Sequence, residues 1–298
     1  MSEVLFGSFR SPYMQRALAQ VLLLALLGGV VGVHVVLRRL AFVTEALQHT
    51  VFPGIAVAFL LGRDLLLGAV VAAVVTVLLL VALSRARRIG QDGALALLTA
   101  TAFAAGVVMV SRGRSYQHDL TVLLFGRILT VDGRQLVETG VLAVVCTIVL
   151  LALHKELVLL AFDEVAAAAL GYRAAVVEIA LNVVLALVVV AAIRSVGTVL
   201  VVAFVVTPAA AALLVARSPA QAMVLAVGFA AVSGWIGLVV SFDLSVRRGV
   251  DLASGATIVV VMTGGFLAVL GGTSIYRSTV RRRPGRTSRV DRAEASAA

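Results

Sequence analysis

The chain has 298 residues, of which 61% are hydrophobic and only 13% are charged, and its mean hydropathy is +1.11. A soluble globular domain carries about twice that share of charged residues, so this composition excludes a soluble fold. The formal net charge is +10, and much of it lies in the C-terminal stretch that begins at Arg277. Because this stretch directly follows an apolar segment, we interpret it as a cytoplasmic anchor near anionic lipid and expect no nucleic-acid partner.

Apolar stretches of about 20 residues, the length that a transmembrane helix needs, recur along the whole chain. Strict alternation of apolar and polar residues is absent, which favours helices over the strands of a barrel. We therefore predict an all-α fold, a polytopic transmembrane helical bundle of eight to nine spans in the lipid bilayer. Nine stretches fit, at residues 14–37, 40–61, 64–84, 93–111, 134–154, 173–195, 197–216, 220–242 and 252–271.

Three parts follow along the chain. They are an N-terminal segment at residues 1–13, a transmembrane domain at 14–272, and a basic tail at 273–298 that is predicted to be disordered. Arginine-rich connections at 38–39 and 85–88 fall on the same side of this arrangement as the tail, and the positive-inside rule makes that side cytoplasmic. The N-terminus is then expected outside.

The most informative motif is RRLAFVTEALQHTVFPG at residues 38–54, in the second predicted span. Glu45 and His49 are four residues apart and so share one face of a helix. An ionisable side chain at the centre of a bilayer costs about 3 kcal/mol or more, so it usually faces a cavity, a partner or an ion. Pro53 has no N–H, which leaves the carbonyl of His49 as a third potential ligand. Carboxylate, imidazole and carbonyl together suit a divalent transition metal, although Glu45 and His49 could also simply pair with each other.

A second segment, HKELVLLAFDEVAAAALGY at residues 154–172, connects the fifth and sixth predicted spans on the cytoplasmic side. Asp163 and Glu164 place negative charge at the start of a short helix, and Gly171 is suited to end it. This pattern predicts a docking helix, with a plain interfacial connector as the alternative. In the seventh span, Pro208 is predicted to kink the helix, as Pro53 is in the second.

Several common catalytic motifs are absent from the chain. The sequence contains no GxxxxGK[ST], no HExxH and no GxSxG. Its only lysine, Lys155, does not follow a glycine-rich loop. We therefore expect that the chain is not an enzyme, that it does not itself hydrolyse ATP, and that it binds no permanent cofactor.

Four segments in order resemble the permease subunit of the ABC transporters for zinc, manganese and iron. They are RRLAFVTEALQHTVFPG, HKELVLLAFDEVAAAALG, IRSVGTVLVVAFVVTPAAAALL and SGATIVVVMTGGFL, and the similarity covers roughly residues 14 to 271. The resemblance implies a multi-pass protein of the bacterial plasma membrane that imports a divalent metal ion along a path at a homodimer axis. It also implies two further partners, a cytoplasmic ABC ATPase subunit and an extracytoplasmic metal-binding solute receptor.

The resemblance also implies roles for particular residues. His49 matches the motif histidine, and Glu45 matches a position usually held by aspartate, so both would line the metal path. The longer glutamate side chain leaves the choice between zinc, manganese and iron open. Coupling to the ATPase is implied for six residues of the docking segment: Phe162, Asp163, Glu164, Ala169, Leu170 and Gly171.

The alternative function is an ion-coupled secondary transporter of a metal ion without an ATPase partner. In such a protein Glu45 would carry a proton, and inverted repeats with broken helices in both halves would be expected. We find no symmetric counterpart of the motif at residues 38–54 in the sequence. The importer permease is therefore the favoured interpretation.

Overall fold

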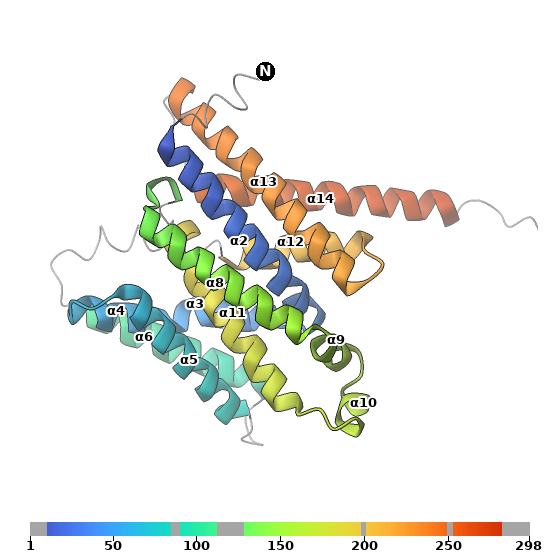
Figure 1. Cartoon of the computed structure of the whole chain (residues 1–298), viewed down its shortest axis with the longest axis horizontal. Helices are drawn as coiled ribbons and strands as arrows, with labels where there is room; N and C mark the ends of the chain where they lie inside the picture. Colours follow the sequence, from blue (N-terminus) through green and yellow to red (C-terminus); the bar gives the residue numbers. More distant parts are fainter. Residues whose placement is uncertain (1–10, 85–89, 112–127, 198–200, 249–252, 282–298) are drawn as a thin grey trace, which may run out of the picture.

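The computed structural model describes residues 11–84, 90–111, 128–197, 201–248 and 253–281, which form helices and no strand (Figure 1). The predicted all-α membrane bundle is thereby confirmed. In chain order the elements are α2 (Pro12–Leu37), α3 (Ala41–Thr50), α4 (Phe52–Leu60), α5 (Leu65–Ser84), α6 (Gln91–Val110), the 3-10 helix η2 (Ile128–Thr130), α8 (Gly133–Ala152), α9 (His154–Phe162), α10 (Glu164–Ala169), α11 (Ala174–Val196), α12 (Val201–Val215), α13 (Pro219–Arg248) and α14 (Ser254–Arg281).

By length and composition, seven helices could cross a membrane: α2, α5, α6, α8, α11, α13 and α14. The prediction of eight to nine full-length spans is therefore too high for the described residues. The predicted span at 40–61 is divided at Val51 into α3 and α4, and the predicted span at 197–216 corresponds to α12, which has only 15 residues. A helix of that length covers about 22 Å, less than the ~30 Å of the hydrocarbon core.

Pro53 explains the division of the second predicted span. It cannot donate a hydrogen bond to the carbonyl of His49, so the ladder of helical hydrogen bonds is interrupted there. α3 ends at Thr50 and α4 begins at Phe52, which places Pro53 in the first turn of α4, where a missing N–H costs little. The apolar character of the sequence continues across this break, and for that reason the sequence predicted one continuous span.

The ends of the chain are described only in part. α14 continues to Arg281, beyond the predicted start of the tail at residue 273. Residues 1–10 and 282–298 lie outside the described residues. The predicted boundaries of the N-terminal segment and the tail, and the predicted disorder of the tail, therefore stay predictions.

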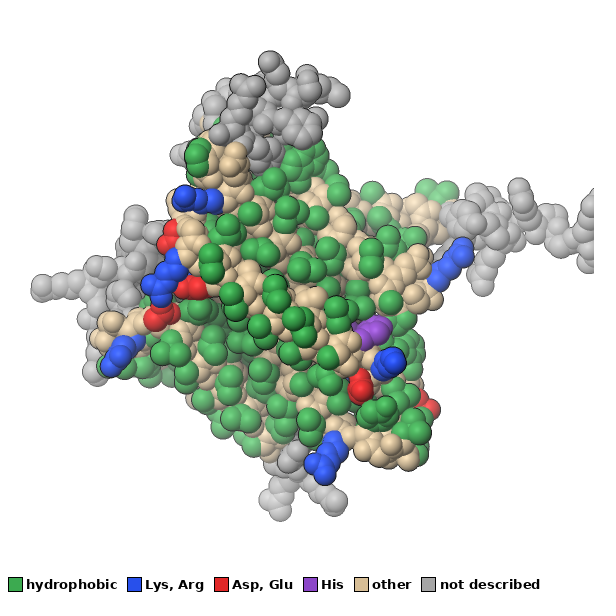
Figure 2. Space-filling view, viewed as in Figure 1, with side chains coloured by type: hydrophobic (Ala, Val, Ile, Leu, Met, Phe, Trp, Pro, Cys, Tyr) green, Lys and Arg blue, Asp and Glu red, His purple; other side chains and the backbone are tan. Residues whose placement is uncertain are grey.

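Hydrophobic side chains cover most of the face shown in Figure 2, and Lys, Arg, Asp and Glu gather at its margins. This is the distribution expected when the middle of a bundle lies in lipid and its ends lie in water, because a charged side chain is costly at the centre of a bilayer. The surface thus agrees with a multi-pass membrane protein.

α2 lies at the centre of the bundle, where it packs against α8, α12 and α13 and is buried along most of its length. Glycines allow α12 to approach it closely. A Cβ on Gly28 would lie 3.1 Å from the carbonyl oxygen of Phe204, and a Cβ on Gly32 would overlap the carbonyl oxygen of Val205. Pro208 has no N–H to donate to the Phe204 carbonyl. This carbonyl lies against Gly28, which has no side chain. The helix α12 continues on both sides of Pro208, and the predicted kink stays a prediction.

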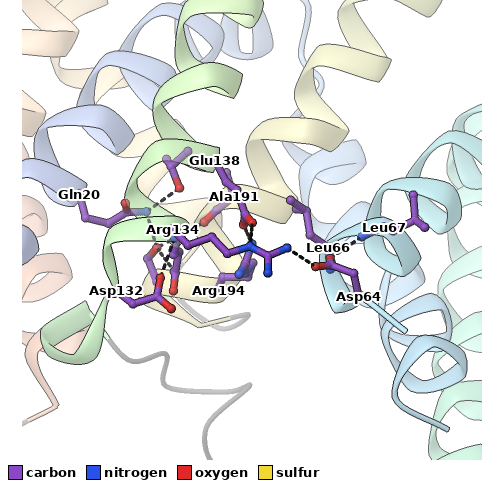
Figure 3. A network of polar contacts seen from close by, with 12 residues as sticks. Gln20, Asp64, Leu66, Leu67, Asp132, Arg134, Glu138, Ala191 and Arg194 are labelled. Atoms are coloured by element: carbon purple, nitrogen blue, oxygen red, sulfur yellow. Dashed lines mark hydrogen bonds and ion pairs between the residues drawn. The ribbon is translucent and has the colours of Figure 1, made fainter. Parts of the chain in front are cut away.

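Polar side chains connect several elements at the end of α8 that is remote from α9 (Figure 3). Arg134 of α8 pairs with Asp64, in the turn after α4, at 3.1 Å and with Glu138 at 2.9 Å. Glu138 also accepts a hydrogen bond from Arg194, near the end of α11, at 2.7 Å. The pKa of Asp64 lies below its usual value, mainly because the carboxylate accepts a hydrogen bond from the backbone N–H of Leu67. The turn between α4 and α5 is thus joined through α8 to α11.

A buried amide lies next to this ionic network. Gln20 of α2 is completely buried, and its Nε2 donates to Thr139 of α8 at 3.1 Å and to Ser195 of α11 at 2.6 Å (Figure 3). In an apolar interior such hydrogen bonds replace those that water would make, so they fix the relative register of three helices.

We expect Gly32→Ala to destabilise the protein, because its Cβ would overlap a backbone carbonyl of α12 and force the two helices apart. The expected loss is about 1–3 kcal/mol of unfolding free energy, visible as a lower thermal unfolding temperature in detergent. The matched control is Gly228→Ala in α13, where a Cβ would meet nothing within 4 Å. Equal effects of the two substitutions would show that the α2–α12 contact is not tight.

Candidate functional site

The turn between α2 and α3 fixes the direction of the helix that carries the predicted metal ligands. The N–H of Leu40 donates to the carbonyl of Val35 at 2.8 Å, and the N–H of Arg39 donates to that of Val36 at 3.1 Å. These are the two hydrogen bonds of a Schellman motif. Arg39 adopts the left-handed φ of 58° that the motif requires, at a position where glycine is the commonest residue. α3 then begins only two residues after Arg39.

Glu45 and His49 lie together on α3, as their spacing predicts. Oε1 of Glu45 is 3.3 Å from Nε2 of His49. The His49 ring also packs edge-to-face on Phe103 of α6, with ring centroids 5.5 Å apart. Both side chains are partly accessible, with 50% of Glu45 and 34% of His49 exposed. The pair is therefore held on one side by α6 and open on the other.

One copy of the chain does not complete a coordination shell around this pair. In the part of the chain that the structure describes, no group of three or more His, Cys, Asp or Glu side chains is placed to hold one metal ion. Transition metals in proteins usually take four to six ligands, so Glu45 and His49 need further donors. The role of Glu45 and His49 as metal ligands stays a prediction.

A cavity of about 510 Å³ opens beside Glu45, between α3 and α6. Its lining includes Glu45 from α3 and Asp92 from the first turn of α6, together with apolar residues such as Phe42. Sequence reasoning missed Asp92. The available signal was an acidic residue at the start of an apolar helix, directly after the arginine-rich connection at 85–88.

The Pro-Gly pair at the end of the motif brings α4 onto α5. Pro53 lies in the first turn of α4, and the next residue, Gly54, faces Gly68 of α5 so closely that a Cβ on either one would overlap the backbone of the other. This crossing allows α4 and α5 to form a close pair next to α6. The helix after the predicted metal ligands is thus held by backbone contact.

The predicted docking segment at residues 154–172 forms two short helices, α9 and α10. Asp163 precedes α10, and its Oδ1 accepts a hydrogen bond from the N–H of Ala166 at 2.8 Å. At the other end, the N–H of Tyr172 donates to the carbonyl of Ala167 at 3.1 Å, and Gly171 adopts a left-handed φ of 82°. The sequence prediction of a helix that starts at Asp163 and stops at Gly171 agrees with these caps.

Several predicted coupling residues are exposed on the surface of the chain. Phe162 and Leu170 are 71% and 69% exposed, and Val165 between them is 80% exposed. Glu164 and Ala169 are exposed as well. Large apolar side chains at the aqueous end of a membrane bundle are typical of a protein contact surface. The contact with an ATPase subunit stays a prediction.

A bundle of apolar helices, seven of them long enough to cross a membrane, with charged side chains at the margins of the face in Figure 2, defines a multi-pass membrane protein. In this bundle Glu45, paired with His49, lines a cavity between α3 and α6. The chain belongs to the ABC 3 transport family, whose model matches residues 10–272. The resemblance to metal-type ABC permeases, inferred from four sequence motifs, is thereby confirmed.

Individual relatives agree with this family. The manganese transport system membrane protein MntC of Halalkalibacterium halodurans is 34% identical over 249 residues, which cover 84% of this chain and 83% of that protein. A probable iron transport system membrane protein of Haemophilus influenzae is 27% identical over 275 residues, 92% of this chain and 99% of that protein. The solved structure of PsaBC from Streptococcus pneumoniae in complex with a Fab has a TM-score of 0.80 at 29% identity and covers 90% of this chain and 94% of that chain.

Proposed function

We propose that this chain is the membrane-spanning subunit of an ATP-driven importer of a divalent transition metal, in which two copies form the ion path. The observation that carries the proposal is the Glu45–His49 pair, which is anchored against α6 on one side and accessible on the other. Two copies related by a twofold axis would bring two carboxylates and two imidazoles together. Four such ligands reach the lower limit of the four to six that transition metals usually take in proteins.

Manganese is the cargo that we expect first and iron second. The relatives bear the names of manganese and iron transport proteins. Carboxylate and carbonyl oxygens suit manganese, and the motif offers both the Glu45 carboxylate and the carbonyl of His49, which Pro53 leaves without its helical donor. Zinc, which takes the same imidazole and carboxylate donors, is the third candidate.

ATP hydrolysis is assigned to a separate subunit that docks on α9 and α10, and capture of the ion to an extracytoplasmic receptor protein. The exposed apolar side chains of the coupling segment support such a contact. The alternative, a secondary transporter without an ATPase, does not account for the exposure of Phe162, Val165 and Leu170.

The metal site is tested by uptake of manganese in cells that lack their own importer and express this chain with its ATPase and receptor. We expect His49→Ala and Glu45→Gln each to reduce uptake at least about tenfold, since even the loss of a group that only orients a metal ligand costs about 10- to 100-fold. Glu45→Asp keeps the carboxylate and is the matched control, expected to retain most of the uptake.

Two outcomes would contradict this assignment. If Glu45→Gln transports as well as Glu45→Asp, the carboxylate does not contact the ion, and the pair is only a helix contact. If uptake by the unchanged protein persists with an ATPase subunit that cannot hydrolyse ATP, the secondary transporter becomes the better description.

The docking surface is tested by co-purification of the ATPase subunit with the permease. We expect Phe162→Ala combined with Leu170→Ala to weaken the association at least about tenfold, since truncation of large side chains at the centre of an interface costs about 2 kcal/mol or more. Val224→Ala, at a similarly exposed apolar position on α13, is the control and should leave the association unchanged. Retention of the ATPase by the double variant would remove this surface from the proposal.

A further inference from the structure

Arg38 occupies an unusual position at the end of α2. Its side chain is only 7% exposed, yet it carries a full positive charge. One nitrogen, Nη2, donates to Oε1 of Glu178 in α11 at 3.0 Å and lies 3.7 Å from Oε1 of Glu164 in α10. The buried Nε and Nη1 atoms have no hydrogen-bond partner among the described residues. A buried guanidinium depends on its carboxylate partners, because leaving it unpaired is strongly unfavourable.

The two carboxylate partners of Arg38 lie on helices that are held differently in the bundle. Glu178 lies in α11, most of which is buried in the bundle, and its contact with Arg38 is within hydrogen-bond distance. Glu164 is the first residue of α10, a six-residue helix at the surface, and its side chain is 74% exposed. At 3.7 Å the contact with Glu164 is an ion pair without a hydrogen bond. A movement of less than about 1 Å would convert it into one.

After Arg38, the chain continues directly into α3, the helix that carries Glu45 and His49. Arg38 is the residue that ends α2, and the Schellman turn at Arg39 and Leu40 joins it to α3, which carries Glu45. That turn is fixed by two backbone hydrogen bonds, so a displacement of Arg38 is transmitted to the start of α3 with little loss. The guanidinium thus lies between the coupling helix α10 and the helix of the predicted ion site.

A further contact places the coupling segment against the same end of α2. His34, one turn before Arg38, is buried, and its ring lies edge-to-face with the ring of His154, with centroids 5.5 Å apart. His154 is the first residue of α9. The end of α2 therefore touches both short helices of the coupling segment.

We propose that Arg38 is a positioning residue: it makes the position of α3 depend on the position of α10, and so couples the ATPase to the ion site. This inference rests on the proposed function. When the ATPase moves α10 toward α2, Glu164 comes within hydrogen-bond distance of the guanidinium, which has free donors at Nε and Nη1 in the described part of the chain, and pairs with it alongside Glu178. The end of α2 and the turn to α3 follow, and Glu45 and His49 move with them. A purely structural ion pair would stabilise the fold without affecting how much metal moves for each ATP.

The test uses the complete transporter, reconstituted in lipid vesicles with its ATPase and receptor, and measures Mn²⁺ uptake and ATP hydrolysis in the same sample. Arg38→Gln and Glu164→Gln are the test variants. We expect the number of Mn²⁺ ions moved per ATP hydrolysed to fall at least fivefold in each. Arg217→Gln removes the same charge from an exposed residue between α12 and α13, away from the turn after α2, and is the matched control, expected to keep the wild-type ratio.

Glu164→Gln keeps the test valid if Arg38→Gln does not fold, because the Glu164 side chain is largely exposed and its loss leaves Arg38 paired with Glu178. An unchanged ratio in Glu164→Gln overturns the inference, as does an equal fall in Arg217→Gln. If the unchanged transporter moves no Mn²⁺, Fe²⁺ or Zn²⁺ on addition of ATP, the proposed function fails and the inference fails with it.

Discussion

The contact of α2 with the backbones of α12 and α13 is the constraint on which the remaining structure depends. A Cβ on Gly29 would lie 2.6 Å from the backbone nitrogen of Val227, and a Cβ on Gly32 would overlap a carbonyl of α12. In lipid there is little hydrophobic gain from bringing helices together, so close backbone packing of this kind supplies the attraction. The position of α2 then fixes the Schellman turn at its end, and through it the direction of α3. The positions of Glu45 and His49 thus depend on glycines that lie at least 13 residues earlier in the chain.

Much of the fold could be predicted because membrane-spanning helices can be recognised in the sequence as long apolar stretches. α2, α5, α8 and α11 lie where hydropathy predicts them. The division at Val51 could not be placed, because hydropathy averages over a window and does not register a break of one residue. The presence of Pro53 indicated a local disturbance, whereas its position in the first turn of a new helix depends on the packing of α4 on α5. The hydrogen bonds of Gln20 likewise depend on the rotation of three helices.

The candidate site likewise has one part that the sequence predicts and another that only the tertiary structure shows. The Glu45–His49 pair and the caps of α10 are local features, set by spacing of four residues and by Asp163 and Gly171, so the sequence alone predicted them. The pairing of Arg38 with Glu178 joins residues 140 positions apart, and the cavity that Glu45 shares with Asp92 exists only when α3 lies beside α6. Contacts of this kind follow from tertiary packing, and no local pattern of residue types reveals them.

The unequal lengths of α12 and α14 have a consequence for the surrounding membrane. α12, with 15 residues, has protein neighbours in α2, α13 and α14, so its shortfall of about 8 Å is met by other helices and does not thin the lipid. α14 has 28 residues, or about 42 Å, and few of the residues in its apolar window are buried. Such a helix must tilt or extend beyond the hydrocarbon. A change in bilayer thickness should therefore alter the inclination of α14 while leaving α12 and its contact with α2 undisturbed.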